Sequence, residues 1–271
     1  MDNLFFSIFA FIGSFFAGFL GSLTGLGGGV IVVPMLTILF GVDIHYAAGA
    51  SLIAVIGTSS GAASAYVKEG YSNIRVGMFL EVATTIGAII GASLAGIIPS
   101  NVIYIIFSFV LLYSAASSFF MKMGNGNLIV EDKYAKLFKL NGNYPTLEGF
   151  EEYKVQKVSS GFGICSFAGI ISGLLGIGGG VIKVLAMDRI MKIPFKVSAT
   201  TSNFMIGVTA VASAGIYFKN GYIHTSLVMP VMLGVLFGAF LGSKIMKFAS
   251  SKILKIIFSI IVITIIPVRI G

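Results

Sequence analysis

The sequence predicts an all-α integral membrane protein made of two related halves, and its composition is the first reason. Of the 271 residues, 56% are hydrophobic and 10% are charged, whereas an ordinary soluble chain carries about 25% charged residues. Apolar stretches of about 20 residues can span a bilayer as helices. Such stretches occupy residues 4–23, 47–67, 76–98 and 102–121. No Lys or Arg precedes the first stretch, so we expect a retained helix rather than a secretory signal peptide.

An internal duplication is the second reason. Adding 151 to a position in the first half gives an equivalent residue at most positions, without a gap. The matched pairs include residues 25–31 with 176–182, Ser51 with Ser202, Tyr66 with Tyr217, Lys68 with Lys219, and Gly70 with Gly221. Chance similarity between apolar segments would not keep Lys, Tyr and Gly in register, so we predict two structural repeats.

The charges of the connecting segments predict that the two repeats cross the membrane in opposite directions. Residues 40–46 and 99–101 of the first copy contain no Lys or Arg, whereas both equivalent segments of the second copy are basic. The basic residues are Arg189, Lys192 and Lys196 in one segment and Lys244, Lys247, Lys252 and Lys255 in the other. Because Lys and Arg are enriched in cytoplasmic loops, we predict inverted-topology repeats.

Inversion requires an odd number of full crossings in each repeat, and three segments follow each glycine-rich element. We therefore expect about four to five membrane segments per repeat, with a glycine-broken or re-entrant hairpin opening each one. The predicted organisation is a first transmembrane repeat at residues 1–121, a cytoplasmic connecting loop with some helix at 122–158, and a second transmembrane repeat at 159–271. Both termini would lie outside, in a multi-pass protein of the cell membrane.

Two glycine clusters interrupt the apolar stretches at equivalent places. They comprise Gly25, Gly27, Gly28 and Gly29, and Gly176, Gly178, Gly179 and Gly180. Irregular backbone inside a bilayer survives where protein or a water-filled cavity satisfies its amide groups. A helix that restarts after each break would direct N–H groups and partial positive charge toward the cluster, which favours an anion. We predict that the clusters meet near the bilayer midplane and bind substrate.

The alternative interpretation of these clusters is close helix packing, which is the role we predict for Gly87 with Gly91 and for the equivalent pair, Gly238 with Gly242. Neither cluster is a Walker loop, since no Gly-Lys-Ser or Gly-Lys-Thr ending follows. A dinucleotide-binding fingerprint is also excluded, because no alternating strand and helix pattern surrounds the glycines.

Polar residues near the clusters are further candidates for substrate binding. Lys183 replaces the equivalent Val32, and a lysine close to a helix break in lipid is costly unless it is used. It could hold an anion, or its side chain could extend to the cytoplasmic interface. Ser51, Thr201, Ser202 and Asn203 could hydrogen-bond a polar solute, or could serve in bonds between helices.

Glu81 is a candidate coupling site for a proton or cation, and it could instead form an ion pair with Arg75. His45 and His224 fall at loop edges, and we expect no catalytic constellation or metal site around them. The single cysteine, Cys165, lies in an apolar run and predicts neither a disulfide framework nor a metal cluster. We therefore expect no enzyme activity and no cofactor.

These features together resemble the TauE/SafE family of sulfite-exporter-like membrane proteins, over nearly the whole chain. The resemblance rests on the two halves, on Gly-Leu-Gly-Gly-Gly-Val-Ile-Val-Val-Pro at residues 25–34 with its repeat at 176–184, and on Ala-Thr-Thr-Ser-Asn-Phe at 199–204. It implies transport of sulfur-containing or related organic anions, often outward. The second repeat departs from the family pattern, with Leu185 at the position equivalent to Pro34.

The predicted function is transport, as a probable exporter, of a small sulfur-containing anion such as sulfite by alternating access. The alternative is a passive channel or a cation- or proton-coupled transporter that uses Glu81. The expected partners are a small anionic solute and the lipid bilayer, with a homodimer left open. Nucleic acid is not expected, because the net charge of +8 is spread over short connections and one loop.

Overall fold

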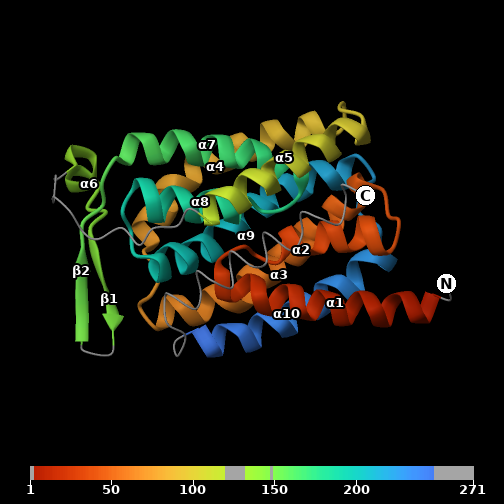
Figure 1. Cartoon of the computed structure of the whole chain (residues 1–271), viewed down its shortest axis with the longest axis horizontal. Coiled ribbons are helices and arrows are strands. Elements are labelled where there is room, and N and C mark those ends of the chain that lie inside the picture. Colours follow the sequence, from red (N-terminus) through yellow and green to blue (C-terminus); the bar gives the residue numbers. More distant parts are fainter. Residues whose placement is uncertain (1–2, 120–131, 147–148, 247–271) are drawn as a thin grey trace.

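The computed structural model describes residues 3–119, 132–146 and 149–246, and within them the chain is mostly helical (Figure 1). The helices of the first half are α1 (Asn3–Thr24), α2 (Gly29–Pro34) with the π-helical turn η1 (Met35–Leu39), α3 (Ile44–Lys68), α4 (Ile74–Ala95) and α5 (Ser100–Phe119). Those of the second half are α7 (Val158–Leu175), α8 (Gly180–Leu185) with the π-helical turn η2 (Ala186–Ile190), α9 (Phe195–Lys219) and α10 (Thr225–Met246).

Helix length and composition agree with an all-α membrane protein. Among the described residues, five helices are long and apolar enough to cross a membrane: Phe5–Thr24, Ile74–Ala95, Val158–Leu175, Phe195–Lys219 and Thr225–Ile245. Two shorter apolar helices, Gly29–Leu39 and Ser100–Val110, accompany them. Lys247, Lys252 and Lys255, on which part of the charge comparison rests, lie outside the described residues.

The connector between the halves contains the short helix α6 (Lys133–Leu137) and a two-stranded antiparallel hairpin of β1 (Gly142–Thr146) and β2 (Gly149–Tyr153). The helix was expected in this loop, whereas the hairpin was not predicted. Tyr144 donates a hydrogen bond to Glu151 across the strands, and burial together with this carboxylate raises the pKa of Tyr144 to about 12.

The connector is fixed to one end of the helix bundle (Figure 1). Asn73, which caps the N-terminus of α4 through its side-chain oxygen, also donates to the carbonyl of Leu140 and to the hydroxyl of Tyr153. On the second half, the backbone N–H of Gln156 donates to the carbonyl of Met191. The segments before α4 and after η2 therefore meet the connector at the same end.

The opposite end of the bundle contains the segments before α3, before α5 and before α10. His45 stacks on Tyr222 with ring centroids 4.9 Å apart, and its Nε2 lies 3.0 Å from the carbonyl oxygen of Ala95. Because α3 has 25 residues, its two ends are roughly 37 Å apart. This length separates the His45 end from the connector end.

Helices of the two halves pack against each other in equivalent pairs. α1 packs along α10, and the equivalent helix α7 packs along α4. Glycines make this close approach possible: a Cβ atom at Gly87 would lie 2.9 Å from the backbone nitrogen of Ile170, and one at Gly238 would lie 2.8 Å from that of Phe19. The packing role predicted for these glycine pairs is confirmed.

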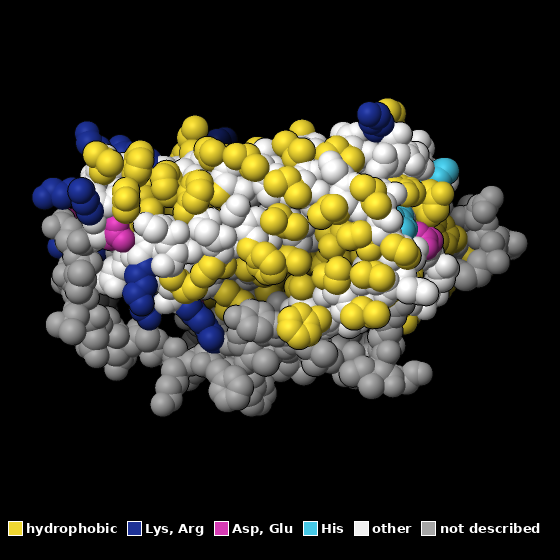
Figure 2. All heavy atoms as spheres, turned by 90° about the horizontal axis from the view of Figure 1, so that it is seen from above, with side chains coloured by type: hydrophobic (Ala, Val, Ile, Leu, Met, Phe, Trp, Pro, Cys, Tyr) yellow, Lys and Arg dark blue, Asp and Glu magenta, His cyan; other side chains and the backbone are white. Residues whose placement is uncertain are grey.

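Apolar side chains cover the middle of the bundle surface (Figure 2). On the face shown, most Lys and Arg side chains gather at the connector end, His side chains lie at the other end, and acidic side chains are visible at both ends. Large side chains such as Ile86 and Phe109, 56% and 70% exposed, belong to this apolar surface. Such a surface suits the hydrocarbon of a bilayer.

We predict that Gly87→Val lowers the thermal stability of the purified protein in detergent. The added side chain would push α4 away from α7, at a cost of about 1–3 kcal/mol. Gly163→Ala on α7 is the matched control, because no atom lies within 4 Å of its Cβ position. Equal melting temperatures for the two variants, measured by scanning fluorimetry, would contradict this packing role.

Candidate functional site

The two glycine clusters form sharp reversals between helices, as predicted. We call residues 25–29 the first glycine segment and residues 176–180 the second glycine segment. Three glycines in each segment have φ between +67° and +78°, a conformation that side-chain-bearing residues rarely adopt. α1 ends at Thr24 and α2 starts at Gly29, while α7 ends at Leu175 and α8 starts at Gly180. Both segments therefore open a short helix directed away from the reversal.

Leucine in place of proline does not alter the second reversal. α8 has six residues and a five-residue π-helical turn after it, as α2 has. Leu185 thus takes the same backbone conformation as Pro34, with φ and ψ of −64° and −39° against −64° and −34°. The departure from the family pattern leaves the backbone conformation unchanged.

The two glycine segments contact each other directly. A Cβ atom at Gly180 would lie 2.9 Å from the Cα of Leu26, and one at Gly29 would lie 3.1 Å from the Cα of Ile177. These contacts are equivalent under the 151-residue offset. They leave no room for side chains at the two glycines, so each segment requires glycine for this approach.

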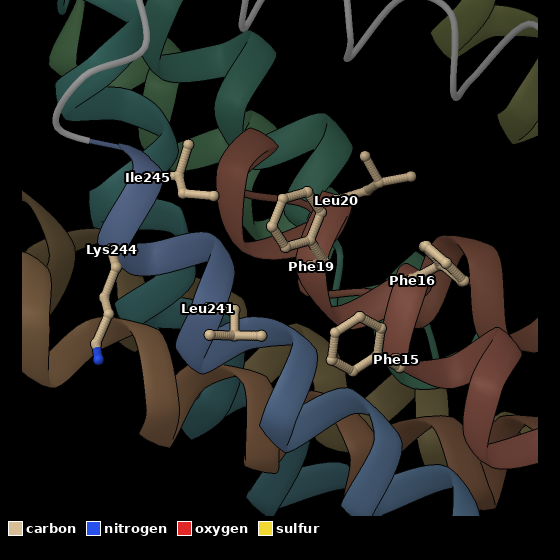
Figure 3. Close-up of a pocket in the computed structure, with 7 residues that line it drawn as sticks. All are labelled: Phe15, Phe16, Phe19, Leu20, Leu241, Lys244 and Ile245. Carbon is tan, nitrogen blue, oxygen red and sulfur yellow. The ribbon is translucent and has the colours of Figure 1, made fainter.

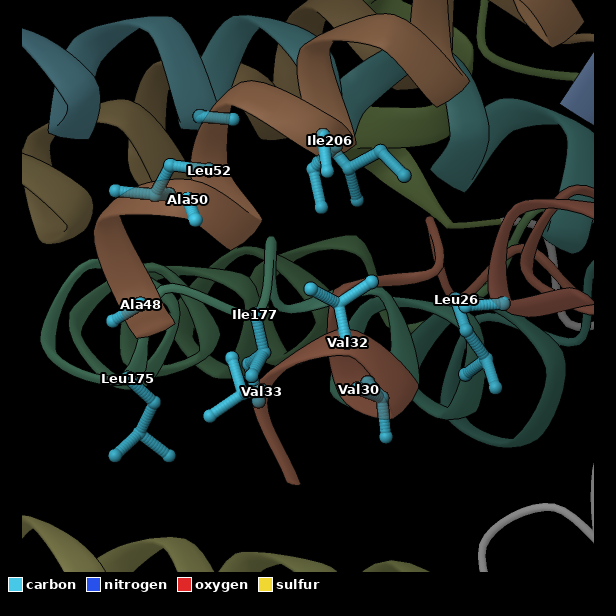
Figure 4. Packing of buried hydrophobic residues seen from close by; sticks show 14 of the residues in the cluster. Leu26, Val30, Val32, Val33, Ala48, Ala50, Leu52, Leu175, Ile177 and Ile206 are labelled. Carbon is cyan, nitrogen blue, oxygen red and sulfur yellow. The ribbon is translucent and has the colours of Figure 1, made fainter. Parts of the chain in front are cut away.

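Each glycine segment also rests on a helix of the other half. The Cβ position of Gly25 lies 2.7 Å from the Cα of Ala199 on α9, and that of Gly176 lies 2.6 Å from the Cα of Ala48 on α3. Around the contact the core is apolar (Figure 4). Leu26, Ile177 and Ile206 are all fully or almost fully buried there. The centre is therefore closed in this structure.

Three buried polar atoms near the glycine segments lack a hydrogen-bond partner: Ser51 Oγ, Ser172 Oγ and Asn203 Oδ1. Ser51 Oγ lies 2.8 Å from the Cβ position of Gly29, and Ser172 Oγ lies 3.4 Å from that of Gly179. The Asn203 amide is oriented by a 2.7 Å bond from its Nδ2 to the carbonyl of Ser22. Buried polar atoms are nearly always paired, so such a group of unpaired atoms calls for an explanation.

Ser172 is absent from the sequence prediction. Its equivalent in the first half is Gly21, so the comparison of repeats offers no matching hydroxyl. Its position one turn before Gly176, on the helix that leads into the break, is the signal that could have identified it.

The other predicted hydroxyls have different roles. Ser202 donates to the carbonyl oxygen of Gly25 at 2.8 Å and lies 3.5 Å from that of Gly180, so it links the two glycine segments. Thr201 accepts a hydrogen bond from the backbone N–H of Asn73 at 3.0 Å. Its hydroxyl therefore faces the loop before α4 and is not brought to the glycine segments.

Lys183 and Glu81 form an ion pair inside the bundle. The Nζ of Lys183, which is fully buried, lies 3.6 Å from Oε2 of Glu81. Thr209 joins the two, because its hydroxyl accepts from Lys183 and donates to Oε1 of Glu81. Thr85 donates a further 3.1 Å bond to the same carboxylate oxygen.

This pairing corrects two alternatives drawn from the sequence. Lys183 does not reach an interface, because none of its side chain is exposed. Glu81 pairs with Lys183 rather than with Arg75, whose guanidinium donates instead to the carbonyl of Lys139. The pair could have been suspected from the repeats, because the residues equivalent to Lys183 and Glu81 in the other half, Val32 and Met232, are uncharged.

His45 has polar neighbours that the sequence did not predict. Asp43 Oδ1 lies 2.9 Å from its Nδ1, and Ser100 donates to Asp43 Oδ2 at 2.9 Å. Burial raises the pKa of Asp43, but hydrogen bonds from the His45 backbone and from Ser100 outweigh it and hold that pKa below its ordinary value. Because the serine and the aspartate share one ring nitrogen and a carbonyl occupies the other, this is not a nucleophile triad.

No group of three or more His, Cys, Asp or Glu side chains that could hold a metal ion occurs within residues 3–119, 132–146 and 149–246. A groove of about 480 Å³ lies on the surface between α1 and α10 (Figure 3). Apolar side chains line it apart from Lys244, so its chemistry suits lipid tails rather than a small anion. The lining residues are Phe15, Phe16, Phe19, Leu20, Leu241, Lys244 and Ile245.

We predict that Lys183→Met and Glu81→Gln each destabilise the protein, and that the double variant loses less than the sum. Removing one partner of a buried pair leaves an unpaired charge, at a cost of about 3–5 kcal/mol. Melting temperatures of the four proteins would measure the coupling, with Glu152→Gln on the exposed hairpin as control. Additive effects would show that the two charges do not interact.

Comparisons with known proteins find similar sequences over nearly the whole chain. The family model of the sulfite exporter TauE/SafE matches residues 10–267. The probable membrane transporter protein YunE of Bacillus subtilis is 27% identical over 256 residues, which is 92% of each chain. YdhB of the same organism, also named a probable membrane transporter protein, is 25% identical over 241 residues, covering 89% of this chain and 91% of its own.

A third relative is a probable membrane transporter protein of Methanocaldococcus jannaschii. It is 28% identical over 267 residues, covering 90% of this chain and 88% of its own. No solved structure gives a significant match.

Proposed function

Because the chain belongs to the TauE/SafE family of multi-pass membrane transporters, we propose that it carries a small sulfur-containing anion such as sulfite across the membrane. The observation that carries this proposal is the meeting of the two glycine segments beside unpaired hydroxyls. Ser51 and Ser172 come from different halves, and both hydroxyls are free to donate. Hydroxyl donors without partners suit an oxyanion.

The short helices support an anion at this place. α2 and α8 both begin at the last glycine of their segment, so the partial positive ends of two helices face the contact. In membrane transporters, broken helices of this kind direct their N-terminal ends at anionic groups of the substrate near the midplane. The bundle would hold the anion by hydroxyl and N–H groups, with Lys183 one turn away on α8.

Inverted repeats are the second part of the proposal. The segment after η2 lies at the connector end with the segment before α4, whereas His45, which follows the segment after η1, lies at the other end. Equivalent connections at opposite ends are what an in-plane pseudo-twofold axis requires. The gathering of Lys and Arg at the connector end supports a cytoplasmic location for that end (Figure 2).

Transport would proceed by alternating access. Each glycine segment rests on a helix of the other half, so the closed contact can open only when the halves move relative to each other. Rocking of one repeat against the other would expose the site first to one side and then to the other. Export is the expected direction of net movement.

A transporter coupled to a proton or cation through Glu81 is the second candidate. The observation that favours it is a carboxylate within the membrane, almost fully buried and within 3.6 Å of a lysine. If Glu81 alone bound the cation, this second mechanism would require the carboxylate to separate from Lys183.

We predict that Ser51→Ala and Ser172→Ala each raise the half-saturating concentration for anion flux about tenfold. This is the effect of one lost hydrogen bond to a charged group. Melting temperatures should stay unchanged or rise, since neither hydroxyl has a partner to lose. Flux of sulfite, thiosulfate and sulfoacetate into proteoliposomes would measure the effect.

The control is Ser60→Ala, an exposed hydroxyl that donates within its own helix. Normal flux in both site variants would show that these hydroxyls do not bind the anion. A fall in flux matched by an equal fall in stability would assign them a structural role instead.

We further predict that single cysteines at positions 43 and 192, in a Cys165→Ala background, react with a membrane-impermeant maleimide from opposite sides of the membrane. Position 43 should be labelled in intact cells, and position 192 should be labelled in inverted vesicles. Labelling of both positions from the same side would reject inverted repeats.

A further inference from the structure

The buried ion pair lies next to the second glycine segment, and its two charges come from different halves. Lys183 is in the first turn of α8, where its backbone N–H donates to the carbonyl of Gly179 at 3.1 Å. Glu81 is on α4, and Thr209 on α9 joins the two side chains. Any movement of the second glycine segment therefore moves the cation of this pair.

Among the described residues, Lys183 is the only Lys or Arg whose side chain has no exposed surface. An anion that entered the closed core would be attracted to it. In this structure the negative group beside Lys183 is the carboxylate of Glu81. The carboxylate is held by Thr85 and Thr209 through Oε1, while Oε2 has no hydrogen bond and faces Lys183 at 3.6 Å. The contact is long for a hydrogen-bonded pair, and it leaves Lys183 able to exchange one oxyanion for another.

Charge balance then constrains what happens to Glu81. With both side chains charged, the closed site is neutral. An anion on Lys183 would leave Glu81 as an unpaired carboxylate inside the membrane, which is strongly unfavourable. A proton taken from water on the side of entry restores neutrality, because protonated Glu81 can remain bonded to the two threonines.

No other titratable group named here supplies a positive charge that could neutralise the unpaired Glu81 carboxylate. Cys165 on α7 is fully buried, and a thiol carries no positive charge in either protonation state. Asp188 and Arg189 on η2 have interactions of their own. On α9, Lys196 lies 13 residues before Thr209 in the sequence, which is roughly 20 Å along a helix. On α4, Arg75 is bonded to the connector.

We propose that the transported anion displaces Glu81 from Lys183, and that the proton which then neutralises Glu81 crosses the membrane with the anion. Resting on the proposed anion transport, this assigns the coupling ion: one proton moves with each anion in the same direction, and the combined gradients of anion and proton set the direction of net movement. Thr209 is a positioning residue, because it orients both charges and need not touch the anion. Release of the anion and the proton on the far side restores the ion pair.

The test uses the full-length protein in proteoliposomes that contain a pH-sensitive dye, with the membrane potential held at zero by potassium and valinomycin. Labelled sulfite, thiosulfate and sulfoacetate are the probes. With one proton per anion, a pH difference of one unit should sustain about a tenfold accumulation of the anion on the alkaline side. The dye should record entry of protons with the anion.

Variants separate coupling from binding. Glu81→Gln should lose accumulation driven by the pH difference, and the exchange of labelled for unlabelled anion that remains should not depend on that difference. Lys183→Met should lose both exchange and accumulation. Glu152→Gln on the exposed hairpin is the matched carboxylate control and should change neither.

Three results would overturn the inference. If the unsubstituted protein moves an anion with no change of internal pH, the coupling is wrong and anion transport stands. If Glu81→Gln still accumulates anion along the pH difference, Glu81 does not carry the proton. If none of the three anions moves through the unsubstituted protein, both the inference and the proposed function are rejected. The measurement of internal pH requires no variant, so it decides even if a variant fails to fold.

Discussion

The contact of the two glycine segments is the constraint on which the rest of the structure depends. Each segment reverses the chain with glycines in a left-handed conformation, and each packs against the backbone of the other half, Gly25 on Ala199 and Gly176 on Ala48. No side chain fits between these backbones. The pairs α1 with α10 and α7 with α4 likewise each join a helix of one half to a helix of the other. Neither half therefore has a complete core without the other.

The repeated backbone carries chemistry that is not repeated. Gly180 and Gly29 begin equivalent helices, yet Lys183 follows one of them and Val32 occupies the same place in the other. The residue equivalent to Glu81 in the second half is likewise uncharged, namely Met232. Equivalent elements of the two halves pack together around the centre, whereas the single ion pair there has no counterpart under the 151-residue offset. The internal duplication accounts for the equivalent backbone elements, and residues that differ between the two halves account for the charge.

Backbone features could be predicted from the sequence because they depend on local residues. Glycines mark the breaks, apolar length marks the helices, and the 151-residue offset marks which elements correspond. Side-chain partners could not be predicted in the same way. Thr201 and Ser202 are neighbours on one helix, so they point in different directions, and only Ser202 reaches the glycine segments. Glu81 and Lys183 are far apart in the sequence, and their pairing depends on how α4, α8 and α9 pack together.

Opening of the centre is a requirement of the proposed transport, and the contacts between the glycine segments determine what it would cost. Between helices in lipid, association rests on van der Waals packing and polar bonds, because the lipid is as apolar as the side chains. The two glycine segments meet through backbone contacts, and the buried side chains of Leu26, Ile177 and Ile206 pack around them, so separation would disturb this apolar packing as well. The polar link across the contact is Ser202, which donates to Gly25 and lies 3.5 Å from the carbonyl oxygen of Gly180. In the proposed transport cycle, water or the anion would have to replace that bond when the two segments part, so the unpaired hydroxyls of Ser51 and Ser172 lie where such a replacement is needed.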